Sequence, residues 1–194
     1  MEESRILILL EQLLKLSATG EHFSKDEYNR ERYKTISERT AELYALVPGF
    51  QKLQINALDK VGYITPKVGV NAIIENANGT FLFEKRMDDK CWGIPGGWAE
   101  TGFTAEQNVI REMKEETGLN VKVISLLDVI CRNPSPNYIH TSYHVVFKCE
   151  IVSGELKRSH ESEALEWKKI NEIDKWHFDH KEWMERILKI KNRI

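Results

Sequence analysis

The apolar and polar positions divide the chain into a helical first part and a mixed second part. Apolar residues recur every three or four positions from Ile6 to Leu14. This spacing predicts an amphipathic helix with a broad apolar face, because residues three and four apart lie on the same side of a helix. We expect Gly20 to end this helix.

A second helix is expected to follow, because Ser24 and Glu27 have the spacing of a capping box. A shorter helical piece is expected over residues 51–59. We therefore predict a small all-helical N-terminal domain over residues 1–62. So few residues cannot bury all of this aliphatic surface, so the domain is expected to pack on a partner subunit or on the following domain. A self-contained helical hairpin is the alternative.

Residues 63–194 show strand-like segments rich in valine and isoleucine, with helical segments between and after them. A hairpin turn is expected at Asn76–Gly79, and a final helix is expected over residues 178–191. Helices and strands that alternate in this way indicate an α/β/α sandwich with a mixed sheet. Strands are expected at residues 67–75, 80–86, 121–131, 139–152 and 165–168.

A central helix is expected from Ala105 to Thr117. Thr104 and Gln107 form a capping box at its start, and Gly118 supplies the left-handed residue that commonly ends a helix. The side chains expected to face the core are those of Phe103, Val109, Ile110 and Met113.

The same helix carries three carboxylates on one face, those of Glu112, Glu115 and Glu116, with Arg111 one turn before Glu115. Like charges at this spacing repel one another, whereas a divalent cation such as Mg²⁺ prefers oxygen ligands and is usually shared with substrate phosphates. The pattern therefore indicates a metal site that processes phosphates. A solvated acidic helix end is the alternative.

The stretch GGWAETGFTAEQNVIREMKEETGL, residues 96–119, resembles the Nudix box. When Gly97 is aligned with the first glycine of the box, the arginine, the later glutamates and the final glycine of the box all have a match in this chain. One position differs from the box, because Phe103 stands where the family has its first glutamate. That glutamate mainly supports the box arginine in the family, so its loss concerns the orientation of Arg111. The residues in register are Arg111, Glu112, Met113, Glu115, Glu116, Gly118 and Leu119.

The resemblance implies the Nudix fold and a Mg²⁺- or Mn²⁺-dependent hydrolase. The candidate metal ligands that it implies are the Gly96 carbonyl, Glu112, Glu115 and Glu116, and the candidate catalytic residues within the box are Arg111, Glu112 and Glu115. Residues 13–38 and 62–74 also resemble the N-terminal extension of a bacterial Nudix subgroup that hydrolyses nucleoside diphosphates linked to X, including the CDP-choline type. In that subgroup the extension contributes to dimer formation, so a homodimer is expected.

A glutamate near the last strand is expected to act as general base, because many Nudix enzymes place one in that loop. A base needs only a suitable pKa and reach to the attacking water, and the sequence leaves Glu161, Glu163 and Glu166 open, with the first two preferred. Each is equally compatible with a solvated loop carboxylate.

Four further side chains are candidate substrate-binding residues: Lys85, Arg86, Trp98 and His140. The two cations follow the second strand and are suited to phosphate, and an aromatic ring beside the glycine turn could stack on a base. His140 and His144 lie on one face of a predicted strand, where a structural or surface histidine is the commoner case.

Composition limits the other possibilities. The chain has 194 residues, 41% hydrophobic and 30% charged, with a formal charge of -2, which gives no electrostatic footprint for duplex nucleic acid. Three widely spaced cysteines suggest buried thiols in a reducing compartment rather than disulfides or zinc. The apolar run at residues 6–10 is too short to cross a bilayer, so a cytoplasmic protein without a membrane partner is expected.

The function that these observations favour is hydrolysis of a nucleotide-linked small molecule, with CDP-choline and ADP-ribose as the preferred substrates, to a nucleoside monophosphate and X-phosphate. One alternative is a hydrolase of nucleoside triphosphates or of RNA ends. The other is a sensor that binds a nucleotide-linked ligand without cleaving it. The sequence favours an enzyme, because sensors typically lose box carboxylates and Glu112, Glu115 and Glu116 are all present.

Overall fold

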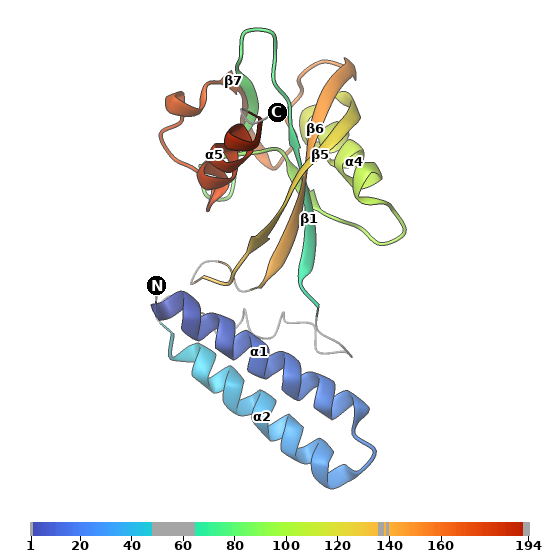
Figure 1. Ribbon diagram of the computed structural model, residues 1–194, viewed down its shortest axis with the longest axis vertical. Coiled ribbons are helices and arrows are strands. Elements are labelled where there is room, and N and C mark those ends of the chain that lie inside the picture. The colour runs from blue at the N-terminus through green and yellow to red at the C-terminus, as the bar shows by residue number, and fades with distance from the viewer. Residues whose placement is uncertain (1, 48–64, 136–137, 139, 192–194) are drawn as a thin grey trace. The chain divides into compact units, whose positions relative to one another are not determined.

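The computed structural model describes residues 2–47, 65–135, 138 and 140–191 (Figure 1). The chain forms two compact units, one of Met1–Lys67 with Cys131–Ser142 and the other of Val68–Ile130 with Tyr143–Ile194. The expected boundary between residues 62 and 63 lies outside the described residues, as does the expected helical piece at residues 51–59.

Two helices form most of the described part of the first unit, α1 (Glu2–Phe23) and α2 (Glu27–Ala45). Gly20 does not end α1, contrary to the sequence prediction. A β-carbon at Gly20 would lie 2.4 Å from the ring of Tyr33, so this glycine lets the two helices approach closely. The cap of α2 is also not the predicted one, because Asp26 accepts the backbone N–H of Asn29 at 2.8 Å.

The apolar residues of α1 divide into two faces. Leu7, Leu10 and Leu14 are buried with Tyr44 of α2. A second set remains exposed, so the described part of this unit leaves an aliphatic stripe uncovered. We call it the α1 stripe, and it consists of Ile6, Leu9, Leu13 and Leu16.

The second unit contains most of the strands, in two sheets with the orders β4-β1-β6-β5 and β3-β2-β7. In the first sheet β1 and β4 are antiparallel, with Asn71 opposite Gly96 and Val70 opposite Gly97. In the second sheet β2 pairs antiparallel with both of its neighbours. The strands are β1 (Lys67–Ile73), β2 (Phe81–Arg86), β3 (Trp92–Gly93), β4 (Gly96–Trp98), β5 (Asn120–Arg132), β6 (Ser142–Ser153) and β7 (Ser162–Lys168).

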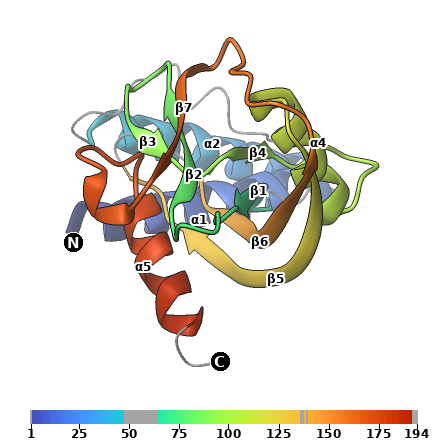
Figure 2. The same ribbon diagram turned by 90° about the horizontal axis from the view of Figure 1, so that it is seen from above.

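Two helices cover opposite faces of these strands, α4 (Ala105–Thr117) and α5 (His180–Lys191), as Figure 2 shows from above. Alternation along β2 explains the two layers, because Phe83 belongs to the core beneath α5 and Leu82 to the core beneath α4. The α/β/α sandwich is therefore as predicted. A short 3₁₀ turn, η1 (Ile170–Glu172), precedes α5. None of the described helices has the length and apolar content to cross a membrane.

The structure corrects some details of the sequence reading. Gly96 and Gly97 were expected in a turn but belong to β4. The last strand begins at Ser162, three residues before the expected start. The three cysteine thiols were expected to be buried, but only Cys149 is buried. Cys91 is half-buried and Cys131 is exposed.

Candidate functional site

The site is organised around α4, whose two ends are as predicted. Thr104 accepts the backbone N–H of Gln107 at 3.1 Å, and the Gln107 side chain accepts the N–H of Thr104 at 2.9 Å. Gly118 ends the helix with a φ of 74° in the left-handed region, which glycine adopts without strain. These local contacts fix where the carboxylate-bearing turns of α4 begin and end.

The predicted core side of α4 is half right. Val109 and Met113 are fully buried against the sheet. Phe103 and Ile110 are exposed by 53% and 37%, so their expected burial is wrong. Phe103 precedes the helix in an exposed turn, and Ile110 lies at the margin of the one side of α4 that the sheet covers. The helical period alone does not show how wide the covered side is.

Arg111 connects the acidic side chains of this region. Its guanidinium donates to Glu112 Oε1 at 2.6 Å and to Glu115 Oε2 at 2.7 Å. The Glu100 carboxylate lies 3.4 Å from the same guanidinium. Phe103 supplies no charge here, and Glu100, three residues earlier, is the additional anion that orients Arg111. The Glu115 side chain is 57% exposed, so it is the most solvated of the three box carboxylates.

Two glycines of β4 allow the backbone to approach these carboxylates. A β-carbon at Gly97 would lie 2.6 Å from Glu112 Oε2, and one at Gly96 would lie 2.1 Å from the carbonyl oxygen of Val70. Gly96 also has a φ of 142°, which is strained for any other residue. The Gly96 N–H donates to Glu116 Oε2 at 2.8 Å. Gly96, Gly97, Glu112 and Glu116 therefore meet in one place. The roles of Gly96, Glu112 and Glu116 as metal ligands stay predictions.

Glu116 is buried beside a second buried carboxylate, Glu84 of β2. Burial, with the repulsion of Glu84, raises the pKa of Glu116 well above its usual range. Burial also raises the pKa of Glu84, although a hydrogen bond from the Ser162 hydroxyl opposes that shift. Burial likewise raises the pKa of Glu112, against the attraction of Arg111. All three carboxyl groups therefore give up their protons less readily than an exposed glutamate would.

Sequence reasoning did not identify Glu84 as part of the site. The available signal is the alternation of FLFEKR, which places Glu84 on the same face of β2 as Leu82. A glutamate that shares a face with a buried leucine is unusual in a solvated strand. Its contact with Ser162 joins residues 78 positions apart, and no local pattern predicts such a contact.

The two preferred late-loop glutamates differ in their surroundings. Glu163 forms ion pairs with Lys85 at 2.9 Å and Lys90 at 3.1 Å, and these bonds lower its pKa. Glu161 instead lines a hollow of about 310 Å³ together with Arg86, Met87, Asp88 and His160. The Glu161 charge also acts on Glu84, so this residue lies near the buried carboxylates. Glu166 is exposed and faces Lys168 at 2.8 Å.

The candidate substrate-binding residues do not all gather at this site. Arg86 lines the 310 Å³ hollow and is paired with Asp88 at 2.9 Å. Lys85 is occupied by Glu163. Trp98, on β4, is 44% exposed. His140 belongs to the first unit, where burial and the charge of Lys67 lower its pKa to about 4.

The donor set fits a divalent cation. Among the described residues, no three His, Cys, Asp or Glu side chains are arranged around a common point as ligands. The carboxylates of Glu112 and Glu116 instead accept hydrogen bonds from Arg111 and the Gly96 N–H. These carboxylate oxygens are nevertheless hard ligands, which Mg²⁺ and Mn²⁺ prefer. A β-carbon would fill the space between Gly97 and Glu112.

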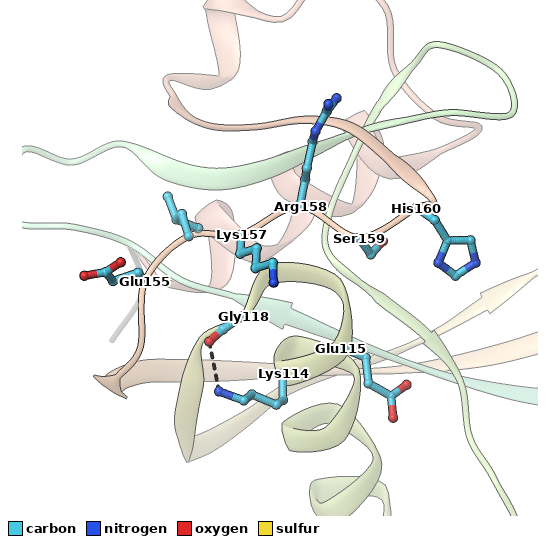
Figure 3. A pocket seen from close by; sticks show the side chains of 9 residues that line it. Lys114, Glu115, Gly118, Glu155, Lys157, Arg158, Ser159 and His160 are labelled. Carbon is cyan, nitrogen blue, oxygen red and sulfur yellow. Dashed lines mark hydrogen bonds between the residues drawn. The ribbon is translucent and has the colours of Figure 1, made fainter.

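A second hollow, of about 700 Å³, lies at the C-terminal end of α4, against residues 155–160 (Figure 3). Lys114 donates to the Gly118 carbonyl at 3.2 Å, so this carbonyl at the C-terminal end of α4 has a hydrogen-bond donor. Arg158 donates to the backbone of Glu163 at 3.0 Å. Most of the charge around this hollow is thus engaged within the protein or opposed by Glu115 and Glu155.

Comparison with protein-family models identifies the family of this chain. Residues 65–187 match the family described as the NUDIX domain, which is more than half of the sequence. The chain belongs to the Nudix family of hydrolases. Residues 4–58 of this Nudix hydrolase match a second family, described as the UDP-X-like, N-terminal oligomerisation domain.

Individual relatives agree with this assignment. An ADP-ribose pyrophosphatase of Methanocaldococcus jannaschii is 36% identical over 135 residues, which are 67% of this Nudix hydrolase and 78% of the relative. A putative ADP-ribose pyrophosphatase of Bacillus subtilis is 29% identical over a match that covers 72% of this chain and 69% of the relative. A crystal structure of a UDP-X diphosphatase is similar to this chain with a TM-score of 0.61 and 23% sequence identity. The match covers 100% of this chain and 97% of the diphosphatase chain. That likeness shows a common fold.

Proposed function

We propose that this Nudix hydrolase is a divalent-metal-dependent enzyme that cleaves nucleoside diphosphates linked to X to a nucleoside monophosphate and X-phosphate. Membership of the family makes it a hydrolase of pyrophosphate bonds. The observation that carries the proposal is the meeting of the Gly96–Gly97 backbone with the carboxyl groups of Glu112 and Glu116.

The names of the two relatives support ADP-ribose as the first substrate to test. CDP-choline, which the likeness of the N-terminal extension favours, is the second. Neither substrate is identified by the geometry of the site, because a diphosphate common to both would meet the same carboxylates.

The chain's own residues have separate tasks in this mechanism. Glu116, Glu112 and the Gly96 carbonyl would hold the cation, with Glu115 at the more solvated edge. A bound divalent ion would neutralise diphosphate oxygens and favour ionisation of the attacking water. Arg111 keeps Glu112 in place through a charge-assisted hydrogen bond.

Water forms a new bond to one phosphorus, the bond from that phosphorus to the bridging oxygen breaks, and the bridging oxygen leaves with the other phosphate. We assign the water proton to Glu161, since it lines the hollow beside Glu84 and Glu116, whereas Glu163 is neutralised by two lysines. Arg86, in the same hollow, is placed to meet a phosphate oxygen. The metal ligands, Glu161 and Arg86 thus form one proposed site.

The N-terminal helices are proposed to form a homodimer. The α1 stripe leaves four aliphatic side chains exposed on one helix face, and the second matched family is described as an oligomerisation domain. Residues 1–62 would then be the dimerisation domain and residues 63–194 the catalytic domain. A cytoplasmic location and the absence of a duplex nucleic acid partner stay predictions.

The test incubates the protein with ADP-ribose, CDP-choline, other nucleoside diphosphate derivatives and nucleoside triphosphates, each with Mg²⁺ or Mn²⁺. Phosphorus-31 spectra then identify the products. A monophosphate with X-phosphate supports the proposal. Release of inorganic pyrophosphate from triphosphates alone would indicate the other hydrolase class, and tight binding without product would indicate a sensor.

A further inference from the structure

The strand that presents Gly96 is held by side chains from elements outside the Nudix box. Asn71 of β1 donates from Nδ2 to the Ile94 carbonyl at 3.1 Å. His180 of α5 accepts the Ile94 N–H at its Nδ1, at 3.0 Å. Both polar groups of the Ile94 backbone are therefore bound by buried side chains, two residues before Gly96.

The orientation of Asn71 is itself determined by His144 of β6. The Asn71 Oδ1 atom lies 2.9 Å from His144 Nδ1, and both side chains are buried. Because Asn71 uses its amide nitrogen to donate to Ile94, its oxygen must accept from the histidine. His144 must therefore carry a hydrogen on Nδ1.

His180 requires the opposite tautomer. Its Nδ1 accepts a backbone N–H, so its hydrogen must lie on Nε2 and the ring must be neutral. Trp183 lies beside both histidine rings, with centroid distances of 4.7 Å to His144 and 4.4 Å to His180. A β-carbon at Gly69 would lie 2.7 Å from the His144 ring, so the backbone also fixes this ring. Both histidine rings are therefore packed against the same tryptophan.

We propose that Asn71, His144 and His180 are positioning residues for the metal site. They fix the Ile94–Gly96 backbone and, with it, the Gly96 carbonyl and the N–H that binds Glu116. The inference rests on the proposed function only through the assignment of the Gly96 carbonyl and Glu116 as metal ligands. Groups that orient a ligand commonly change metal affinity when they are removed, although they do not touch the ion.

The experiment compares His180→Leu with His180→Asn. Leucine removes the acceptor for the Ile94 N–H, whereas the Oδ1 atom of asparagine can occupy the place of Nδ1 and restore it. Mn²⁺ affinity is measured by electron paramagnetic resonance without substrate, and kcat and KM are measured separately. We expect His180→Leu to weaken Mn²⁺ binding by about 10- to 100-fold and His180→Asn to recover most of the loss.

Trp183→Phe is the matched control, because it disturbs the packing of both rings and leaves the acceptor at position 180 in place. A purely structural role would make Mn²⁺ affinity follow thermal stability across the three variants. The proposal instead requires affinity to follow the acceptor at position 180. A folded His180→Leu protein with native Mn²⁺ affinity would overturn it.

Asn71→Asp provides an independent test if His180→Leu does not fold, because it keeps the shape of the side chain and removes the donor to Ile94. Weakened Mn²⁺ binding is expected, and native affinity would again overturn the proposal. Nitrogen-15 spectra of the native histidines should show His144 with hydrogen on Nδ1 and His180 with hydrogen on Nε2, and the reverse pattern would contradict it. A native protein that binds no Mn²⁺ would refute the proposed function instead.

Discussion

Replacement of Glu116 by glutamine separates the proposed metal-binding role of this residue from its structural role. Glutamine has nearly the same shape, and its Oε1 atom can still accept the Gly96 N–H that Glu116 accepts at 2.8 Å. The backbone at Gly96 should therefore keep its position. What the variant lacks is a buried negative charge beside Glu84.

This loss of charge has opposite effects on activity and on stability. Loss of one preorganised electrostatic group commonly lowers turnover by about 100- to 1,000-fold, and we expect Glu116→Gln to fall in this range. The metal-free protein should become more stable, because the folded-state pKa of Glu116 is raised above its unfolded value. Such a group stabilises the fold below the unfolded pKa and loses that contribution as pH rises through the folded pKa. The gain should therefore be largest near and above neutral pH.

The assay measures kcat with Mg²⁺, and urea unfolding in the presence of a chelator between pH 4.5 and 8. Native metal-free protein should lose stability as pH rises across this range, and Glu116→Gln should lose less. Glu84 and Glu112 have raised pKa values too, so part of the slope should remain. Glu106→Gln, on an exposed position of α4, is the matched control. Native turnover in Glu116→Gln, or lower stability without metal, would refute the reasoning.

Three other predictions follow from the same structure. Glu161→Gln should lower kcat by about 100-fold or more and flatten the acid limb of the pH–rate profile. Glu163→Gln should keep kcat within a few-fold of the native value. Equal effects of the two substitutions would contradict the assignment of Glu161 as the general base. Met113→Ala should lower the free energy of unfolding by about 2–5 kcal/mol in urea, because its side chain is fully buried, and a change below 1 kcal/mol would contradict that packing. Leu9→Glu with Leu13→Glu should yield a folded monomer in light scattering, and a native dimer would exclude the α1 stripe as the interface.

Local signals predicted the parts of the fold that depend on nearby residues. Thr104, Gln107 and Gly118 bond within α4 or at its ends, so the helix could be read from their spacing. The same kind of signal failed for α2, because Ser24 and Asp26 both precede Glu27 and either could cap it. Whether a residue is a cap depends on backbone angles that composition does not determine.

The site was predictable where the box determines it and hidden where distant segments meet. Glu112 and Glu116 were found from a motif within one helix. Glu84 was missed because its environment comes from α4 and β7. His144 was weighed only as a histidine on a strand face, and its role depends on Asn71, which lies 73 positions away. Contacts of this range leave no periodic pattern in the sequence.

The departure of this chain from the Nudix box at Phe103 has a physical explanation in the contacts of Arg111. A guanidinium needs several acceptors to stay in one orientation, and here it has Glu112, Glu115 and the nearby Glu100 carboxylate. Glu100 is three residues closer to the glycine strand than the missing glutamate would be. The chain thus retains an anion near its box arginine from another position, but among the described residues the buried Arg111 Nε has no hydrogen-bond acceptor.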